Sequence, residues 1–407
     1  MQDAKRSLIH FCLSFLLFTF PPLAAAKTEP NPSLSPFPVP ASLESSVEFW
    51  KRVFSEFSIS QVIYFDPLDL SKIYEVADIG EERRSNEYFN EERARIAAAR
   101  GVDIERVKVQ RGVKQKTAAG LKRSGRYISQ IKRIFAERGL PTQLTYLPIV
   151  ESSYDINARS SVGALGIWQF MPRTGRQYLR MARGIDERKD PLESSRAAAA
   201  YLKQAYDNLG SWPLAVTSYN FGQAGMAHAV EEVGSTNLVD LIERHDHPYW
   251  GFPPKQFYAE FLAALEIGTN LKRYFPDLSL DAPVEIKETE VTRNTALASL
   301  IRSSGLNRNE FLDWNPALSA SLQVVPAGYR VKLPSNRSIE PLVVLAKTEV
   351  VESKPRARVV HHRVKPGETL YEIAHRYGAS VQQIAQLNGL QRAHLLRVGS
   401  TLRIPRM

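Results

Sequence analysis

The sequence predicts a mainly α-helical protein that ends in small modules built from both helices and strands. In the first three quarters of the chain, apolar residues recur at helical spacing, most clearly from Tyr127 to Phe135. After Pro276, short apolar pieces between Thr, Val, Pro and Gly replace this pattern, and one stretch of sequence occurs twice. At 407 residues the chain is long enough for two or three domains, and its 43% apolar and 24% charged residues are ordinary for a globular protein.

The first 26 residues are expected to be a signal peptide. Lys5 and Arg6 precede an apolar run from Leu8 to Phe20, and Ala24-Ala25-Ala26 offers a cleavage site. The run is short for a membrane-spanning helix, although a retained signal anchor is the alternative. The only cysteine, Cys12, lies in this run, so cleavage would leave no thiol for disulfides or metal binding. We therefore expect export to a bacterial periplasm or cell envelope, with membrane association left open.

Two segments are expected before the main domain. Residues 27–46 are rich in Pro and Ser and are predicted to form an extended tether. Residues 47–138 are predicted to form an N-terminal helical region that packs on the next domain. Its basic stretch from Lys108 to Arg133 is interpreted as a solvated helix face, with attraction to an anionic polymer as the alternative. The net charge of +10 suits an acidic partner, but without a nucleic-acid-binding motif we expect no nucleic-acid partner.

Residues 139–276 are predicted to form a helical domain. A helix is expected up to Glu151, bent at Pro148 because proline cannot donate a backbone hydrogen bond. Asp190 and Pro191 suit the N-cap and first position of an Ala-rich helix that ends at Gly210. Further helices are expected over 212–220 and 255–274.

Glu151 is the candidate for a catalytic acid. It closes a mostly apolar segment, and burial of a carboxyl favours its protonated form, as a general acid at neutral pH requires. Only Glu151 has such surroundings; Asp155 lies in a polar turn and is interpreted as a cap or turn residue. A satisfied, partly exposed glutamate at a helix end is the alternative.

Three motifs follow one another around this acid. Glu151-Ser152-Ser153 is the first, the segment GALGIWQFMPRTG of residues 163–175 is the second, and SYNFG of residues 218–222 is the third. Their order resembles the lysozyme-like transglycosylases, in particular the membrane-bound lytic murein transglycosylase D type. The resemblance implies a lysozyme-like fold for the helical domain.

The resemblance also implies a reaction. The enzyme would cleave the β-1,4 bond between MurNAc and GlcNAc of peptidoglycan without water. Glu151 would protonate the glycosidic oxygen and then accept the proton of the C6 hydroxyl, leaving a 1,6-anhydro sugar. No cofactor or metal is implied. The motifs assign substrate binding, or support of the acid, to Ser152, Ser153, Gln169, Met171, Tyr219 and Asn220.

One position departs from the family pattern. The family usually has a tyrosine in its last cleft helix, and ungapped alignment places Phe257 there, with Tyr258 adjacent. Either Tyr258 takes the role through a one-residue shift, or the enzyme lacks that hydroxyl. Tyr258 is therefore a further substrate-binding candidate.

The repeat lies near the C-terminus. Residues 300–316 align with residues 373–389, so that Asn315 matches Asn388. The second copy, residues 361–406, resembles a LysM module, which implies glycan binding. The first copy, residues 285–335, lacks the opening PGET and is interpreted as a degenerate LysM-like module whose sugar binding is open; residues 336–360 are the linker. The LysM resemblance assigns glycan contacts to Gly367, Glu368, Thr369 and Leu390.

Two other functions remain open from the sequence. A goose-lysozyme-like hydrolase could use the same fold with water as the nucleophile. A non-catalytic glycan-binding scaffold would carry the same modules without activity. All three share peptidoglycan glycan strands as the partner, and the oligomeric state is left open.

Overall fold

A computed structural model describes residues 35–82 and 84–339, and in the C-terminal part residues 358–365, 368–377, 379, 384–385, 387–390 and 398–406. The predicted signal peptide lies outside the described residues. The chain divides into two compact units at residue 340. The described elements are mostly helices, followed by small α+β modules, so the predicted fold class is confirmed.

The N-terminal region contains a sheet that the sequence analysis did not predict. Strands β1 (Gln61–Asp66), β2 (Asp69–Asp78) and β3 (Lys108–Arg111) form an antiparallel sheet in the order β2-β1-β3. The prediction of a helical region over residues 47–138 is therefore wrong for these three strands. The physical reason is the run from Val62 to Phe65, whose β-branched and aromatic side chains are all buried and fit a strand with both faces covered.

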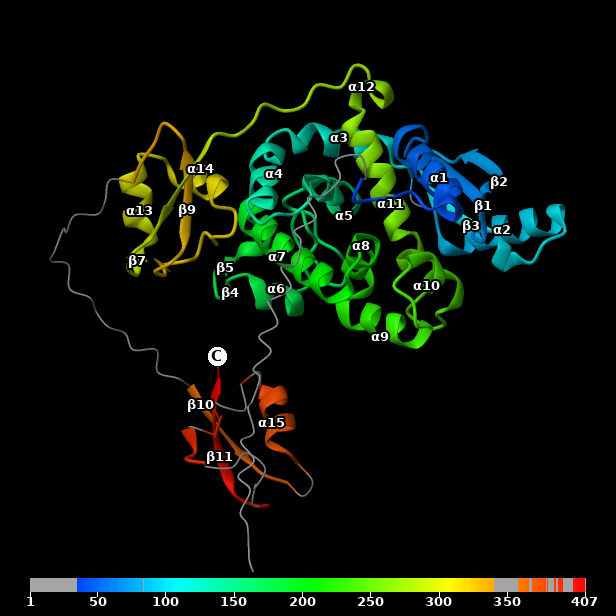
Figure 1. Cartoon of the computed structure of the whole chain (residues 1–407). Helices are drawn as coiled ribbons and strands as arrows, with labels where there is room; N and C mark the ends of the chain where they lie inside the picture. Colours follow the sequence, from blue (N-terminus) through cyan, green and yellow to red (C-terminus); the bar gives the residue numbers. More distant parts are fainter. Residues whose placement is uncertain are drawn as a thin grey trace, which may run out of the picture. The chain divides into compact units, whose positions relative to one another are not determined.

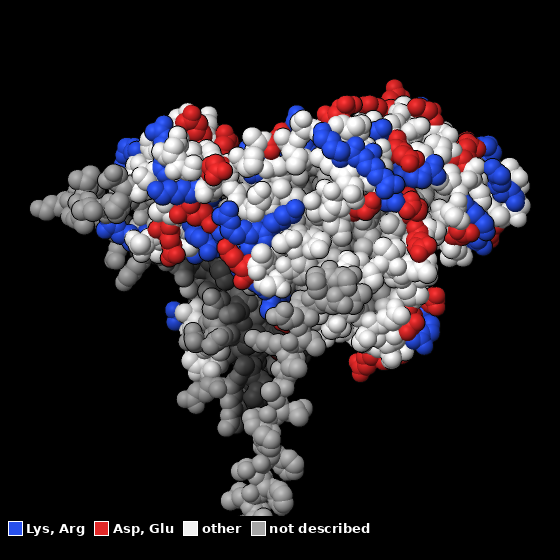
Figure 2. Space-filling view, turned by 45° about the horizontal axis from the view of Figure 1, so that its top comes forward, with Lys and Arg blue, Asp and Glu red and all other residues white. Residues whose placement is uncertain are grey.

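The rest of this region is helical. It consists of α1 (Glu44–Ser55), α2 (Asn86–Arg100), α3 (Lys114–Ser124) and α4 (Ile128–Ala136). On the face seen in Figure 2, basic and acidic side chains are mixed. Lys114, Lys116, Lys122 and Arg133 are exposed, in agreement with a solvated face for the basic stretch.

The segment before α1 is packed and does not form a tether. Phe37 is 3% exposed, and its ring meets the Phe261 ring edge-on at a centroid distance of 5.0 Å. Leu43, at the end of the 3-10 turn η1 (Ala41–Leu43), is 5% exposed. The tether prediction is therefore wrong for residues 35–46, because these two side chains anchor a Pro-rich segment by burying apolar surface.

The central domain is a bundle of short and long helices around α11 (Phe252–Thr269), which contacts α1, α5 and α8 (Figure 1). The others are η3 (Thr142–Tyr146), α5 (Leu147–Ser152), α6 (Pro172–Tyr178), η4 (Glu187–Lys189), α7 (Pro191–Leu209), α8 (Trp212–Phe221), α9 (Gln223–Val233), α10 (Leu238–Arg244) and α12 (Leu271–Tyr274).

The longest helix, α7, begins and ends as its sequence predicts. The Asp190 carboxylate accepts hydrogen bonds from the backbone N–H groups of Leu192 and Glu193, both at 2.9 Å. Pro191 occupies the first turn, and Gly210 ends the helix in the left-handed conformation with φ +67°. These local signals confirm the prediction for this helix.

A small α+β module follows α12. Strand β6 (Ile286–Glu290) pairs antiparallel with β9 (Arg330–Pro334), and α13 (Leu297–Ser304) and α14 (Arg308–Trp314) lie between them in sequence. The short strands β7 (Thr295–Ala296) and β8 (Val324–Val325) also pair. The module is joined to the helical domain by backbone bonds beside β4 (Met181–Ala182) and β5 (Ile185–Asp186), among them Asp186 N–H to the Ala317 carbonyl at 2.9 Å.

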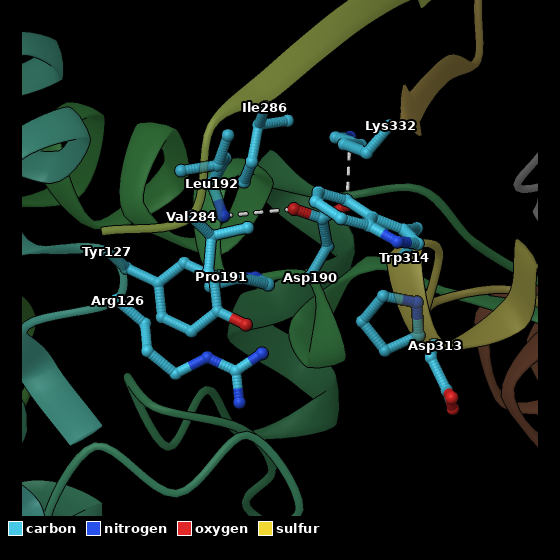
Figure 3. A pocket seen from close by; sticks show the side chains of 11 residues that line it. Arg126, Tyr127, Asp190, Pro191, Leu192, Val284, Ile286, Asp313, Trp314 and Lys332 are labelled. Atoms are coloured by element: carbon cyan, nitrogen blue, oxygen red, sulfur yellow. Dashed lines mark hydrogen bonds and ion pairs between the residues drawn. The ribbon is translucent and has the colours of Figure 1, made fainter. Parts of the chain in front are cut away.

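Buried charges also join this module to the helical domain. The Lys332 side chain is 3% exposed, and its Nζ lies 2.8 Å from Asp190 Oδ2 and 2.8 Å from Glu193 Oε1. Beside it is a cavity of about 140 Å³. Figure 3 shows Lys332 and Trp314 of the module on one side of this cavity and Arg126 and Tyr127 of the helical domain on the other.

The second unit contains β10 (Arg358–Arg363), α15 (Leu370–Tyr377) and β11 (Thr401–Arg406), with β10 and β11 antiparallel. The aligned asparagines of the repeat make matching bonds in the two modules. Asn315 accepts from Lys332 N–H and donates to Lys332 O, both at 2.9 Å. Asn388 does the same with Arg403, both at 2.7 Å. The sequence repeat is therefore also a structural repeat.

Candidate active site

Glu151 lies near the end of the short helix α5, whose length is set by the residues at its two ends. Pro148 occupies the first turn of α5, and Ser153 ends the helix in the left-handed conformation with φ 51°. The Glu151 side chain is half-buried. Burial, followed by the charge of Glu260, raises the pKa of Glu151 to about 8. A carboxyl with this pKa is largely protonated at neutral pH and can act as a general acid.

A second carboxyl belongs to this site, which the sequence analysis missed. Glu260 of α11 is half-buried, and burial raises its pKa to about 8 as well. The expectation that only Glu151 has such surroundings is therefore wrong. Glu260 lies among the apolar residues of a long helix, and sequence spacing gives no signal that α11 contacts α5.

The two serines after Glu151 sit in a tightly held turn. Ser152 Oγ donates a hydrogen bond of 2.7 Å to the Ile167 carbonyl, which ties the turn to the second motif. Arg123 of α3 donates to the Ser153 carbonyl at 2.6 Å. Gly120 leaves the room for this approach, because a Cβ at that position would lie 2.8 Å from Ser153 Cβ. These contacts favour a role of both serines in holding the turn that carries Glu151. Contact of either serine with substrate stays a prediction.

The second and third motifs meet in one pocket of about 200 Å³. It brings together four of the predicted site residues, and it is lined by Gln169, Phe170, Met171, Thr174, Tyr201, Tyr219, Asn220, Phe221 and Gly222. Met171 is 40% exposed. Tyr219 links the pocket to the acid: burial first, then the Glu151 charge, raise the pKa of its phenol well above the ordinary value.

The loop of the second motif is shaped by Arg188, a residue the sequence analysis did not single out. Its guanidinium donates to the carbonyls of Gly163 and Phe170, at 2.8 and 3.0 Å, and is paired with Asp186 at 2.8 Å. Gly166 has φ +78°, and a Cβ there would lie 1.9 Å from the Arg188 carbonyl oxygen. Only glycine fits this position.

Trp168 belongs to the core behind the pocket. It is fully buried, donates a hydrogen bond of 2.8 Å to Ser195 Oγ and stacks on Phe135 at a centroid distance of 5.6 Å. Its carbonyl accepts the hydrogen bond of the Tyr219 hydroxyl at 2.9 Å. Trp168 thus fixes the side chain of Tyr219 from the rear of the site.

Tyr258 does not reach the pocket. It is 0% exposed, and its hydroxyl donates to the Pro38 carbonyl at 3.0 Å. The prediction of Tyr258 as a substrate-binding residue is therefore wrong. The reason is the packed segment before α1, which covers that side of α11. Phe257 is 3% exposed and has no hydroxyl, and the Tyr258 hydroxyl is bonded elsewhere, so neither residue brings a hydroxyl to the site.

In the second unit, the Glu368 carboxylate has three partners within the module. It accepts from Lys365 N–H at 3.0 Å and pairs with His362 at 2.7 Å and Arg376 at 2.6 Å. These hydrogen bonds lower its pKa to about 2. Leu390 packs against the module core. Gly367 lies outside the described residues, and glycan contacts of Glu368, Thr369 and Leu390 stay predictions.

Among the described residues, no group of three His, Cys, Asp or Glu side chains is arranged to hold a metal ion. Likewise, the helices of the described ranges include none with the length and apolar character needed to cross a membrane.

Comparison with known proteins identifies two domain families. Residues 130–240 match the transglycosylase SLT domain family, and residues 362–405 match the LysM domain family. Membrane-bound lytic murein transglycosylase D of Escherichia coli strain K12 is 29% identical over 286 residues, and so is the protein of the same name from strain CFT073. Each alignment covers 66% of this chain and 61% of the relative, so the chain spans about three fifths of the length of these curated relatives.

Two solved structures are similar over part of the chain. One is an inactive mutant of the lytic transglycosylase Slt from Pseudomonas aeruginosa, with 24% identity and a TM-score of 0.29, covering 37% of this chain and 25% of that chain. The other is the 70 kDa soluble lytic transglycosylase from Escherichia coli, with 20% identity and a TM-score of 0.30, covering 37% and 24%. The two family matches, over residues 130–240 and 362–405, confirm the resemblance found in the sequence.

Proposed function

We propose that the protein is a peptidoglycan lytic transglycosylase that cleaves the MurNAc-β-1,4-GlcNAc bond and leaves 1,6-anhydroMurNAc ends. The observation that carries this proposal is Glu151, a half-buried acid whose pKa is raised to about 8 inside a transglycosylase SLT domain. The pocket formed by the second and third motifs supports it by supplying a place for the sugar.

Each step of the reaction has a role for a residue of the site. The Glu151 carboxyl gives its proton to the glycosidic oxygen as the bond from C1 to that oxygen breaks. The C6 hydroxyl of the same sugar then attacks C1, and Glu151, now a carboxylate, takes the hydroxyl proton. The attack is intramolecular and gains from proximity. Gln169, Met171, Tyr219 and Asn220 would bind the sugar that carries C1.

The LysM domain extends the proposal to the whole chain. A LysM domain that binds GlcNAc-containing glycan would hold the cleavable strand at high local concentration near the SLT domain. A protein with this activity would act in the bacterial cell envelope, to which the predicted export signal, cleaved or retained as an anchor, would direct it.

Product mass tests the proposal. Purified peptidoglycan sacculi are digested with the wild-type protein, with Glu151→Gln and with the matched variant Asp155→Asn, whose carboxylate only caps a turn by accepting the Asn157 N–H at 2.9 Å. We expect the wild type and Asp155→Asn to release products that are lighter by one water than the fragments hydrolysis would give. Glu151→Gln should release none. Equal release by Glu151→Gln would rule the proposal out.

The presence of Glu260 supports one alternative function, hydrolysis of the same bond, which can be tested. Glycosidases that use water or a protein nucleophile place two carboxyls around the scissile bond, and Glu260 supplies a second one near Glu151. A goose-lysozyme-like hydrolase would therefore release reducing ends that contain the added water. The same mass measurement separates the two functions. A glycan-binding scaffold would release neither product.

A further inference from the structure

Glu260 lies on the side of α11 that faces the helix of the proposed acid. Phe257, Glu260, Ala264 and Gly268 are spaced by three or four residues, so they line one side of the helix. At Gly268 this side touches Tyr146 so closely that a Cβ would lie 2.3 Å from its ring. Tyr146 is the last residue of η3, and α5 with Glu151 follows directly.

Other residues of α11 are engaged with other parts of the fold. Gln256 accepts a hydrogen bond of 3.3 Å from the Trp50 indole of α1. Tyr258 donates to Pro38, and Phe261 packs on Phe37. Glu260 is the carboxyl that the helix presents toward α5. Within residues 35–82 and 84–339, neither Glu151 nor Glu260 forms an ion pair or a side-chain hydrogen bond.

We propose that Glu260 is a positioning residue of the active site: when it ionises as the pH rises, its negative charge keeps the proton on Glu151 until a sugar oxygen takes it. The inference rests on the proposed function and deepens it. Glu260 acts through Glu151 and does not form a bond to the substrate. It takes over the task of tuning the acid at a site where α11 brings no tyrosine hydroxyl.

The physical basis is that two carboxylates cannot both be ionised at low cost in a poorly solvated site. The pKa of each is raised to about 8, and for Glu151 the charge of Glu260 is the second cause after burial. At neutral pH the pair therefore retains protons and titrates as a unit. When Glu260 is ionised, the proton stays on Glu151, which is the form the first step needs.

The other titratable groups around Glu151 and Glu260 are engaged elsewhere and do not supply a negative charge to Glu151. Tyr219 of α8 donates its hydroxyl to the Trp168 carbonyl, and the Tyr154 hydroxyl donates to the Thr145 carbonyl. Arg123 of α3 is bound to the Ser153 carbonyl. Tyr146 of η3 packs under Gly268 and lies 3.5 Å from Lys132 Nζ. Glu260 is thus the anionic group that bears on Glu151.

The charge acts differently on the two halves of the reaction. In the first, it keeps Glu151 protonated but opposes its ionisation; Glu151 gives its proton to the leaving oxygen and becomes a second anion, whose charge the positive charge developing at C1 offsets. In the second, the neighbouring anion makes the Glu151 carboxylate a stronger base for the C6 hydroxyl proton. Glu260 begins and ends the cycle unchanged, so atoms and charges balance.

The test compares pH profiles of anhydro-product release from sacculi. Glu260→Gln keeps the size of the side chain and removes the charge, so Glu151 should lose its proton at lower pH. We expect the ratio of variant to wild-type rate to be about two-fold lower at pH 8 than at pH 5.5, which corresponds to a shift of the basic limb from about pH 8 by about half a pH unit. Glu260→Asp, which keeps the charge, should restore the limb toward its wild-type position.

The control is Glu266→Gln, on the same helix but directed to Tyr274 at 3.3 Å, and it should leave the profile unchanged. Circular dichroism of each variant verifies folding. A uniform loss of rate in Glu260→Gln without a shift of the basic limb would show a structural role and overturn the inference. Loss of all activity in both Glu260 variants would overturn it too, by showing direct contact with substrate. Failure of the proposed function is distinct: the wild type would then release no anhydro products.

Discussion

Ser153, Tyr154 and Gln169 are the non-glycine residues with positive φ in the described part of the chain, at 51°, 56° and 48°. All three lie in the loops around Glu151. Such a conformation costs about 1 kcal/mol per residue, so it persists only where the surroundings hold it. Here Gln169 is held by its own amide, which donates to the Ala158 and Gly166 carbonyls at 3.1 and 2.8 Å.

Substitution of Gly166 tests how strongly the loop of the second motif depends on its backbone conformation. In Gly166→Ala the new Cβ would collide with the Arg188 carbonyl and force an unfavourable positive φ. We expect the free energy of unfolding to fall by about 2 kcal/mol or more, together with the rate of anhydro-product release. Urea denaturation measures the first quantity and digestion of sacculi the second.

Gly139→Ala is the matched control for backbone strain alone. Gly139 also has positive φ, +67°, but a Cβ there meets nothing within 4 Å. This variant should lose only about 1 kcal/mol and keep its activity. Equal losses in the two variants would show that the contact with Arg188 does not constrain the loop.

At the scale of elements, α11 connects the site to the N-terminal segment. One side of this helix presents Glu260 to α5, while Tyr258 bonds to Pro38 and Phe261 packs on Phe37. The N-terminal segment therefore contributes to the helical core and supports the helix from behind.

Tyr258→Phe tests the corrected place of this tyrosine. The variant loses the hydrogen bond to Pro38, so we expect a fall of about 1 kcal/mol in the free energy of unfolding and an unchanged kcat. Tyr219→Phe is the comparison, because its hydroxyl bonds to Trp168 beside the pocket, and here the rate should fall. A large loss of kcat in Tyr258→Phe at unchanged stability would instead indicate that the Tyr258 hydroxyl acts in the active site.

Local signals in the sequence predicted the elements they control. The Asp190 cap and Gly210 bracket α7, and Pro148 separates the 3-10 turn η3 from α5, because capping and proline effects act within a few residues. The sheet of β1, β2 and β3 was missed because its buried strand pairs with a segment that follows an intervening helix. Such pairing depends on tertiary packing, which outweighs local propensity.

The distinction between local sequence signals and tertiary packing also applies to the residues of the site. Glu151, Gln169, Tyr219 and Asn220 were predicted from their motifs. The fold brings the last three into one pocket, and the Glu151 charge contributes to the raised pKa of Tyr219. Glu260 and Arg188 were not found, because their roles arise only when helices distant in sequence come together. Their neighbours in the sequence carry no sign of that contact.

At the scale of the whole molecule, the α+β module that follows α12 is joined to the helical domain through buried charge. Lys332 and Arg330 of β9 meet Asp190 and Glu193 at the start of α7, and Arg330 Nε lies 2.7 Å from Glu193 Oε1. Burial opposes ionisation of Glu193, but its cationic partners prevail and lower its pKa to about 2. The module and the helical domain are thus expected to move and unfold together.

Lys332→Ala tests this coupling. The change removes a side chain that is 3% exposed and leaves Asp190 and Glu193 without their shared cation, and breaking a buried pair from one side costs about 3 to 5 kcal/mol. We expect the module to unfold ahead of the helical domain, so that calorimetry shows an additional, earlier transition. Lys287→Ala on the neighbouring strand β6 removes an exposed lysine and should change the free energy of unfolding by no more than about 0.5 kcal/mol. If Lys332→Ala melted with the wild-type profile, the buried charges would not be what joins the two parts, and the backbone bonds beside β5 would have to suffice.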